Sequence, residues 1–141
     1  MRKFVKTGVS VALAVVLVIC MVACSTVDKT GLWENADHLR DKEFGKGEKT
    51  VVVEVKAGEQ SVTFTVHTDK NTVGEALLEH ELIDGEQGAY GMYIKSVNGI
   101  VADYDVDRSY WSFYVNGEYA MTGVDTTEIT EGVVYRLEYT K

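Results

Sequence analysis

The sequence predicts an α+β domain, and three features of the chain carry that prediction. Apolar and polar residues alternate in two neighbouring segments, 50–57 and 61–67, as they do in strands with one buried face. Apolar residues in segment 72–82 instead recur at helical spacing. Two Asn-Gly pairs then separate further strand-like segments. A hairpin, one helix and several more strands together form an α+β order, in which a single helix covers one face of a sheet.

The first two dozen residues are predicted to be an export signal and not part of this domain. Three basic residues precede an almost wholly apolar run, and secretory signals have this order of a basic region and then an apolar region. The run ends at "MVACST", which resembles the signal of bacterial lipoproteins, with the small Ala23 before Cys24. The resemblance implies a signal peptide at residues 1–23 and acyl chains, such as palmitate, on Cys24. The protein would then be lipid-anchored at the extracytoplasmic face of a cell membrane. Ordinary secretion with a stray cysteine is the alternative.

Residues 24–49 are predicted to be the lipidated N-terminus and a tether, because the segment is polar and poorly periodic. Trp33, Leu39 and Phe44 are its exceptions. They indicate either that the segment docks on the domain or that it forms a short helix, and we favour partial docking. The domain itself is predicted to span residues 50–141.

The charge of the chain argues against negatively charged partners. The net charge is -8, and residues 1–23 carry three cations and no acids, so cleavage would take the charge to -11. A surface this acidic argues against nucleic acid or anionic lipid as a direct partner.

A β-hairpin is predicted to open the domain. Gly58, Glu59 and Gln60 connect its two strands, which are rich in β-branched residues. The residues that share the predicted buried face are Val51, Val53 and Val55 in the first strand and Val62, Phe64 and Val66 in the second.

A helix is predicted to begin after Thr72. Thr72 and Glu75 have the spacing of a capping box, which satisfies backbone amides that the first turn of a helix leaves unpaired. Ala76 and Leu77 then lie on one helical face. Gly85 is the expected stop, which gives a helix of about three turns.

The remaining segments are predicted to be strands joined by tight turns. Asn98-Gly99 and Asn116-Gly117 favour hairpin turns because both residue types tolerate positive φ. A last strand follows near residues 134–139, where apolar and charged residues alternate.

In combination, these segments resemble a known family. "NTVGEALLEHELIDG", "GMYIKSVNGI" and "YWSFYVNGEYAMTGVDTTEITEG", with a last strand ending in tyrosine, are similar to the transcobalamin C-terminal-like domain. The resemblance spans residues 50–141 and implies a small β-grasp-like domain with an N-terminal hairpin, one capped helix and further strands in a mixed sheet. It also implies a binding or adhesive module and not an enzyme. In transcobalamin-type proteins such a domain caps a corrinoid that a separate helical barrel mainly holds, and this sequence contains no such barrel.

The strand at 110–115 leads to the candidate site. Trp111 and Phe113 suit the face that the helix covers, which leaves Tyr110 and Tyr114 on the uncovered face. Half-exposed aromatic rings are what a planar ligand or a protein partner contacts, although tyrosine is also common on solvent-facing strands. The candidate ligand-binding residues are Tyr90, Tyr93, Tyr110, Tyr114, Tyr119 and Met121.

Catalytic and metal-binding patterns are weak. Three aspartates alternate in segment 103–107 as in the first half of a calcium loop, but Arg108 stands where that loop needs glycine and Tyr114 where it needs glutamate. A solvated acidic turn is the favoured interpretation. The three histidines do not have zinc spacing, and no nucleophile motif or phosphate loop occurs. We therefore expect no enzyme activity, no metal and no resident cofactor.

Together these observations predict a membrane-anchored, extracytoplasmic binding module. It would capture a small planar ligand such as a corrinoid (cobalamin) and hold it for a membrane transporter. The alternative is a protein-interaction or adhesion module that recruits another surface protein by strand addition or packing. A third possibility, an accessory domain of a hydrolase complex, would need a separate catalytic chain.

Overall fold

The structure, a computed structural model, describes residues 26–141. The predicted signal peptide and Cys24 lie outside the described residues. No helix within residues 26–141 has the length and apolar character needed to cross a membrane.

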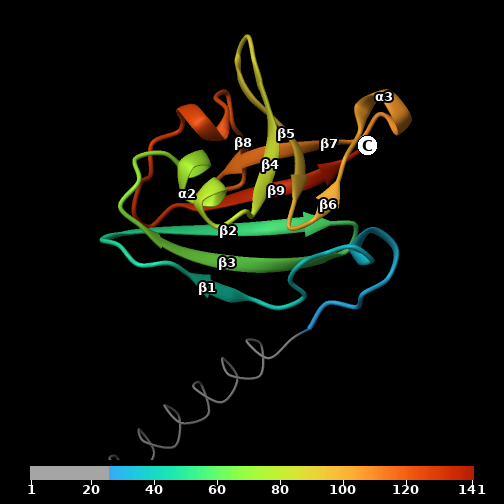
Figure 1. Cartoon of the computed structure of the whole chain (residues 1–141), viewed down its shortest axis with the longest axis horizontal. Helices are drawn as coiled ribbons and strands as arrows, with labels where there is room; N and C mark the ends of the chain where they lie inside the picture. Colours follow the sequence, from blue (N-terminus) through green and yellow to red (C-terminus); the bar gives the residue numbers. More distant parts are fainter. Residues whose placement is uncertain (1–25) are drawn as a thin grey trace, which may run out of the picture.

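The described strands form a six-stranded sheet and a three-stranded sheet (Figure 1). The elements in chain order are η1 (Gly31–Trp33), β1 (Lys42–Phe44), β2 (Lys49–Ala57), β3 (Gln60–Thr68), α2 (Val73–Glu79), β4 (Ile83–Gly88), β5 (Gly91–Val97), β6 (Ile100–Val101), α3 (Tyr104–Asp107), β7 (Tyr110–Val115), β8 (Glu118–Tyr119), η2 (Val124–Thr126) and β9 (Val134–Thr140).

The large sheet has the strand order β1-β3-β2-β9-β7-β8. β2 and β3 form the predicted antiparallel hairpin. The last strand, β9, lies between β2 and β7, parallel to the former and antiparallel to the latter. A hairpin, a helix and a final strand inserted beside the hairpin form the β-grasp-like order, so the predicted α+β class is confirmed. The remaining strands, β4-β5-β6, form the small sheet, a division that the sequence patterns did not show.

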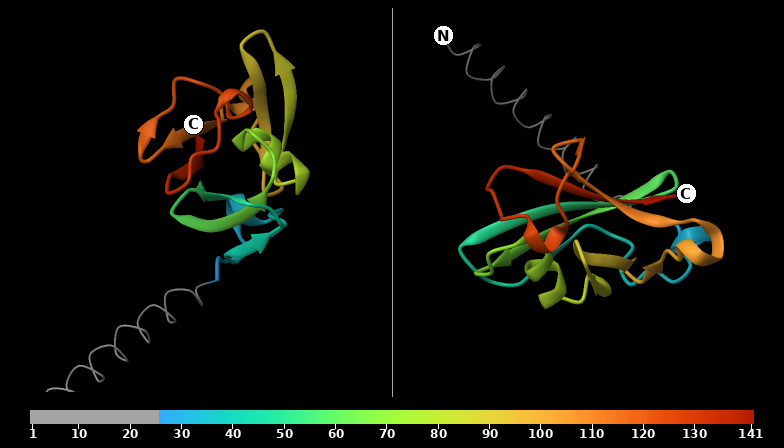
Figure 2. Two further views of the ribbon diagram at one scale, coloured as in Figure 1. Left: turned by 90° about the vertical axis from the view of Figure 1, so that its left-hand side faces the viewer. Right: turned by 90° about the horizontal axis from the view of Figure 1, so that it is seen from above.

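One face of the large sheet is buried, and α2 and the small sheet lie together on that side (Figure 2). Hairpin residues that alternate in the sequence point into this core with at most 2 % of their surface exposed. Trp111 and Phe113 extend the same face on β7, as predicted. Burial of each such side chain contributes roughly 1.5–3 kcal/mol. The buried apolar and aromatic residues of the large sheet are Val51, Val53, Val55, Ala57, Val62, Phe64, Val66, Trp111, Phe113, Tyr135 and Leu137.

The predicted helix exists, but it is shorter than predicted. Thr72 accepts a hydrogen bond from the backbone N–H of Glu75 at 3.2 Å, which confirms the N-terminal cap. α2 ends at Glu79, because Glu81 adopts a positive φ of 56° and turns the chain toward β4.

The helix therefore does not end at Gly85, and the prediction that Gly85 stops it was wrong. Gly85 lies in β4, where the pairing with β5 shifts register. A Cβ atom at this position would collide with the carbonyl oxygen of Tyr93. The glycine thus permits close pairing of two strands, and this contact with a distant residue leaves no local signature in the sequence.

The segment that precedes β2 docks on the domain. Trp33 is only 1 % exposed, and its indole N–H donates to the carbonyl oxygen of Ala57 at 2.9 Å. β1 adds a parallel strand to β3 at the edge of the large sheet. The folded structure therefore begins before residue 50, and the role of residues 24–49 as a tether stays a prediction.

Asn98 joins this N-terminal segment to the small sheet. The side chain is buried; its Oδ1 accepts from the His38 N–H at 2.9 Å and its Nδ2 donates to the His38 carbonyl oxygen at 2.8 Å. The Asn98 backbone donates to Leu82 and accepts from Asp37. Its φ of 52° is one that asparagine tolerates better than most residues. The Asn98 side chain thus forms two hydrogen bonds with the backbone of one residue, as a neighbouring strand would, and so joins the N-terminal segment to the β5–β6 turn.

We expect Asn98→Ala to lower the free energy of unfolding by about 3 kcal/mol, because two backbone groups of His38 lose their partners and alanine is strained at positive φ. Chemical denaturation of the full chain in detergent measures the loss. Asn116→Ala is the matched control, since Asn116 has a similar φ of 49° and a single side-chain bond to the exposed Val134 N–H. The control should cost about 1 kcal/mol. Equal losses in the two variants would contradict the role given to the Asn98 side chain.

Candidate ligand-binding groove

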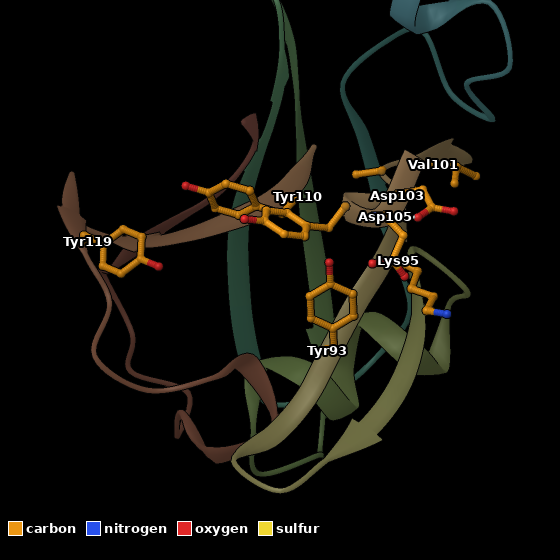
Figure 3. Close-up of a pocket in the computed structure, with 9 residues that line it drawn as sticks. Tyr93, Lys95, Val101, Asp103, Asp105, Tyr110 and Tyr119 are labelled. Carbon is orange, nitrogen blue, oxygen red and sulfur yellow. Dashed lines mark hydrogen bonds between the residues drawn. The ribbon is translucent and has the colours of Figure 1, made fainter. Parts of the chain in front are cut away.

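A groove opens where the small sheet meets the edge region of the large sheet (Figure 3). Its volume of about 700 Å³ is in the range of small-molecule sites. One wall belongs to β5, the other to β7 and β8, and the segment from β6 to α3 closes one end. We call it the tyrosine groove, and its lining residues are Tyr93, Lys95, Val101, Ala102, Asp103, Tyr104, Asp105, Tyr110 and Tyr119.

Strand alternation places the tyrosines. On β7, Trp111 points into the core, so its neighbour Tyr110 points the other way and is half-buried at the groove. On β5, Ile94 is buried and Tyr93 keeps 43 % of its surface exposed. The Asn-Gly turn after β7 returns the chain as β8 and brings Tyr119 to the same space. Figure 3 shows these tyrosines around one opening, although they come from three strands.

The short helix α3 is held in place by polar contacts. The Asp103 carboxylate accepts from the Asp105 N–H at 3.1 Å, and the Asp103 N–H donates to the Ser109 hydroxyl at 3.0 Å. The Tyr104 ring meets the Tyr110 ring edge to face, with centroids 6.4 Å apart. These contacts fix two carboxylates and a fourth tyrosine beside the groove.

Asp107 anchors the other end of α3. Hydrogen bonds from the Ser109 hydroxyl and N–H lower the pKa of Asp107, and Lys141, 3.7 Å away, lowers it further. The Asp107 carboxylate also accepts from the Tyr139 hydroxyl at 3.5 Å. Because the folded-state pKa is lowered, this anchor is present at neutral pH and is lost as the carboxylate protonates in acid.

The charge at the groove is mainly negative. Lys95 is its one lining cation, and the ammonium pairs with Glu86 at 3.0 Å, outside the lining residues. The hydrogen bond to Glu86 raises the pKa of Lys95. In Figure 3 the ammonium points away from Tyr119 and Tyr110. The charge of Asp103 also raises the pKa of Lys95. The two lining carboxylates, Asp103 and Asp105, thus outnumber a single lysine that Glu86 already pairs.

A smaller pocket of about 240 Å³ adjoins the groove and shares Tyr93 and Tyr119 with it. Met92 and Met121 contribute sulfur and methyl groups to its wall. Asp125 is not a lining residue, but its Oδ2 accepts from the N–H of the lining residue Met92 at 3.1 Å and so ties β5 to η2.

The structure brings some of the predicted site residues together and separates others. Tyr93, Tyr110 and Tyr119 line the tyrosine groove. Met121 lines only the adjoining pocket and is 95 % exposed. Tyr90 is 99 % exposed at the tip of the β4–β5 hairpin, which extends beyond the body of the domain (Figure 1).

Tyr114 lies on the same face of β7 as Tyr110 but belongs to a different cluster. The Arg136 guanidinium lies 4.3 Å from the centre of its ring, and the Tyr119 ring meets it edge to face at 5.7 Å. Tyr114 therefore supports Tyr119 from beside the groove. That any of the six predicted residues binds a ligand stays a prediction.

Several lining residues were not among the candidates. Asp103, Tyr104 and Asp105 lie in "DYDVD", a segment for which the sequence predicted a solvated acidic turn, with a calcium loop as the alternative. A tyrosine between acidic residues, close in sequence to the aromatic strand, was the signal that could have found them. Lys95, Val101 and Ala102 carry no such signal, because they join the groove only through the pairing of β5 with β6.

Metal ligation receives no support from the part of the chain that the structure describes. Within residues 26–141, no group of three or more His, Cys, Asp and Glu side chains is placed to hold a metal ion. Two of the aspartates in segment 103–107, Asp103 and Asp107, accept hydrogen bonds from backbone N–H groups within the turn. These bonds fit an acidic turn, the interpretation that the sequence favoured.

Comparison with known proteins identifies a family and a fold. The domain family DUF4430, a domain of unknown function, matches residues 70–141. A crystal structure from Ruminococcus gnavus ATCC 29149, described as that of a candidate metal-binding protein, is 33 % identical, with a TM-score of 0.63; the match covers 67 % of this chain and 98 % of that one. A crystal structure of haptocorrin in complex with Cbi is 20 % identical with a TM-score of 0.48, over 70 % of this chain and 26 % of that one. The latter likeness is too weak to support an inference about function. No curated protein matches the chain.

Proposed function

The chain belongs to the DUF4430 family, and we propose that it is a membrane-anchored, extracytoplasmic module that binds a small planar ligand in the tyrosine groove. The description of the Ruminococcus gnavus protein as a candidate metal-binding protein is not carried over, because the described residues offer no set of metal ligands.

The convergence of tyrosines from separate strands carries the proposal. Tyr93, Tyr110 and Tyr119 surround one cavity, and Tyr93 and Tyr119 keep 43 % and 62 % of their surfaces exposed. A folded protein gains little by leaving several large rings half exposed around a hollow, whereas a flat ligand that covers them gains apolar contact and favourable ring geometry. Backbone groups and the acidic end of the groove would supply the polar contacts.

A corrinoid is the leading candidate for this ligand. The sequence motifs resemble transcobalamin C-terminal-like domains, which implies a corrinoid. A corrin is a wide, flat macrocycle, so more than one ring can contact it, and tyrosines on opposite walls of a groove offer such contacts. The protein would hold the ligand at the cell surface for a membrane transporter.

We expect cyanocobalamin or cobinamide to bind the full chain, purified in a non-ionic detergent, and to change its visible absorption spectrum on titration. Tyr93→Ala and Tyr110→Ala should each weaken binding by roughly fivefold, because each removes about 1 kcal/mol of ring contact. Tyr90→Ala is the matched control, since Tyr90 is outside the groove, and it should bind as the wild type does. No binding at high micromolar concentrations of either corrinoid would rule out this ligand.

The proposed anchor has its own test, in which cells take up an alkyne analogue of palmitate. The wild-type chain should become labelled, and Cys24→Ala should not, because acylation requires the thiol of Cys24. Cys20→Ala is the control and should be labelled, since Cys20 lies within the predicted signal peptide. Labelling of the Cys24→Ala chain would refute the assignment of the anchor.

A second function is favoured by a different observation. Tyr90 and Met121 are 99 % and 95 % exposed outside the tyrosine groove, and a protein partner that covered both would remove these large side chains from water. If the chain is an adhesion module, a partner captured from membranes should be lost in a Tyr90→Ser, Met121→Ser double variant and retained in Tyr93→Ala. The reverse pattern would assign the interaction to the groove, and retention in both variants would exclude both surfaces.

A further inference from the structure

We propose that the tyrosine groove selects a ligand that carries a positive charge next to its flat part. This inference rests on the proposed function, because it names the class of ligand that the same groove takes. The charged group would lie between the tyrosine rings and the carboxylates of Asp103 and Asp105. Anionic planar molecules would be excluded.

The charge around the cavity is unevenly distributed. Asp103 and Asp105 line it, and both are exposed to the solvent that fills it. Lys95 is the single cation among the lining residues, and Glu86 holds its ammonium at 3.0 Å. The ammonium points away from Tyr119 and Tyr110 in Figure 3, but the charge of Asp103 also contributes to the raised pKa of Lys95. One lysine, already paired with Glu86, offsets at most one of the two lining carboxylates. The lining residues thus leave a net negative charge at one end.

The ring faces in the groove differ in whether a cation already lies over them. Aromatic faces attract cations, and two tyrosines already hold one: Arg108 lies 5.1 Å from the ring centre of Tyr104, which lines the groove, and Arg136 lies 4.3 Å from that of Tyr114 beside it. Within residues 26–141, no lysine or arginine lies over Tyr93, Tyr110 or Tyr119. Three of the four tyrosine rings that line the cavity, those of Tyr93, Tyr110 and Tyr119, are therefore available to a cation that arrives with the ligand.

The available ring faces and the carboxylates lie close to one another, because the walls and the acidic end belong to the same cavity. A cation that contacts a ring face and a carboxylate together is held more strongly than by either alone, since the groove partly excludes water. The chemical class is therefore an organic cation with a flat, conjugated body. Corrinoids with a net positive charge fall within this class.

A matched pair of tricyclic dyes tests the inference. The probes are 9-aminoacridine, a cation at neutral pH, and acridine-9-carboxylate, an anion of similar shape. Fluorescence anisotropy with the full chain in non-ionic detergent gives both affinities, with protein-free micelles as the blank. We expect the cation to bind at least tenfold more tightly at low salt, and the ratio to shrink as salt screens the carboxylates.

Variants assign that preference to the groove. Asp103→Asn with Asp105→Asn should bring the affinity ratio down by roughly three- to tenfold, because it removes both charges. The cap of α3 should survive, since asparagine caps helices as well as aspartate does. Glu86→Gln should also lower the ratio, because it frees the ammonium of Lys95 at the rim. Glu59→Gln, an equal change of charge in the exposed β2–β3 turn, should leave the ratio unchanged.

Three results would overturn the inference, and they differ in what they say of the proposed function. Equal affinities for the two dyes would reject selection by charge while leaving the groove as a site for planar ligands. A preference that Glu59→Gln reduces as much as the double variant does would assign it to the overall acidity of the chain. Absence of binding by both dyes would reject selection of flat organic cations as a class; the proposed function would fall with it only if cobinamide also failed to bind.

Discussion

The apolar face of the large sheet is the constraint on which the rest of the structure depends. Six strands present a face that is wider than one short helix can shield, and α2 has only seven residues. The small sheet and the indole of Trp33 therefore complete the cover, and their apolar side chains join one continuous core. Without that cover, side chains worth roughly 1.5–3 kcal/mol each would return to water.

The groove is a consequence of this cover. The small sheet packs on the same side of the large sheet as α2 does, and β5 approaches β7 although the two strands belong to different sheets. Because β5 and β7 meet without sharing a ladder, the side chains that alternate out of the core on each strand face a common space. The same alternation that buries Trp111 and Ile94 exposes Tyr110 and Tyr93 there.

Patterns that are local in the chain could be read from the sequence. The first hairpin, the cap at Thr72 and the turns at Asn98 and Asn116 depend on residues a few positions apart, and all four are present. The features that were missed depend on distant contacts. Position 85 requires glycine because the Tyr93 carbonyl oxygen on β5 leaves no space for a Cβ atom there. The small sheet forms because it buries the apolar face of the large sheet.

The candidate site shows the same limit. Tyr90 and Tyr93 are three residues apart, yet one stands at a hairpin tip and the other in the groove, because strand register decides which side chains face the cavity. Tyr104 lines the groove because it lies in α3, and the position of α3 depends on the contacts of Asp107 with Ser109 and Lys141. Sequence proximity identified three of the tyrosines and could not identify the acidic end.

The most direct test of the central claim, that ligand recognition takes place between β5 and β7, is amide hydrogen exchange of the full chain with and without saturating cobinamide. The account predicts slower exchange in β5, in the segment from β6 to α3 and in β7, with no change in β2 and β3. Slower exchange confined to β2 and β3, or to the tip of the β4–β5 hairpin, would contradict it.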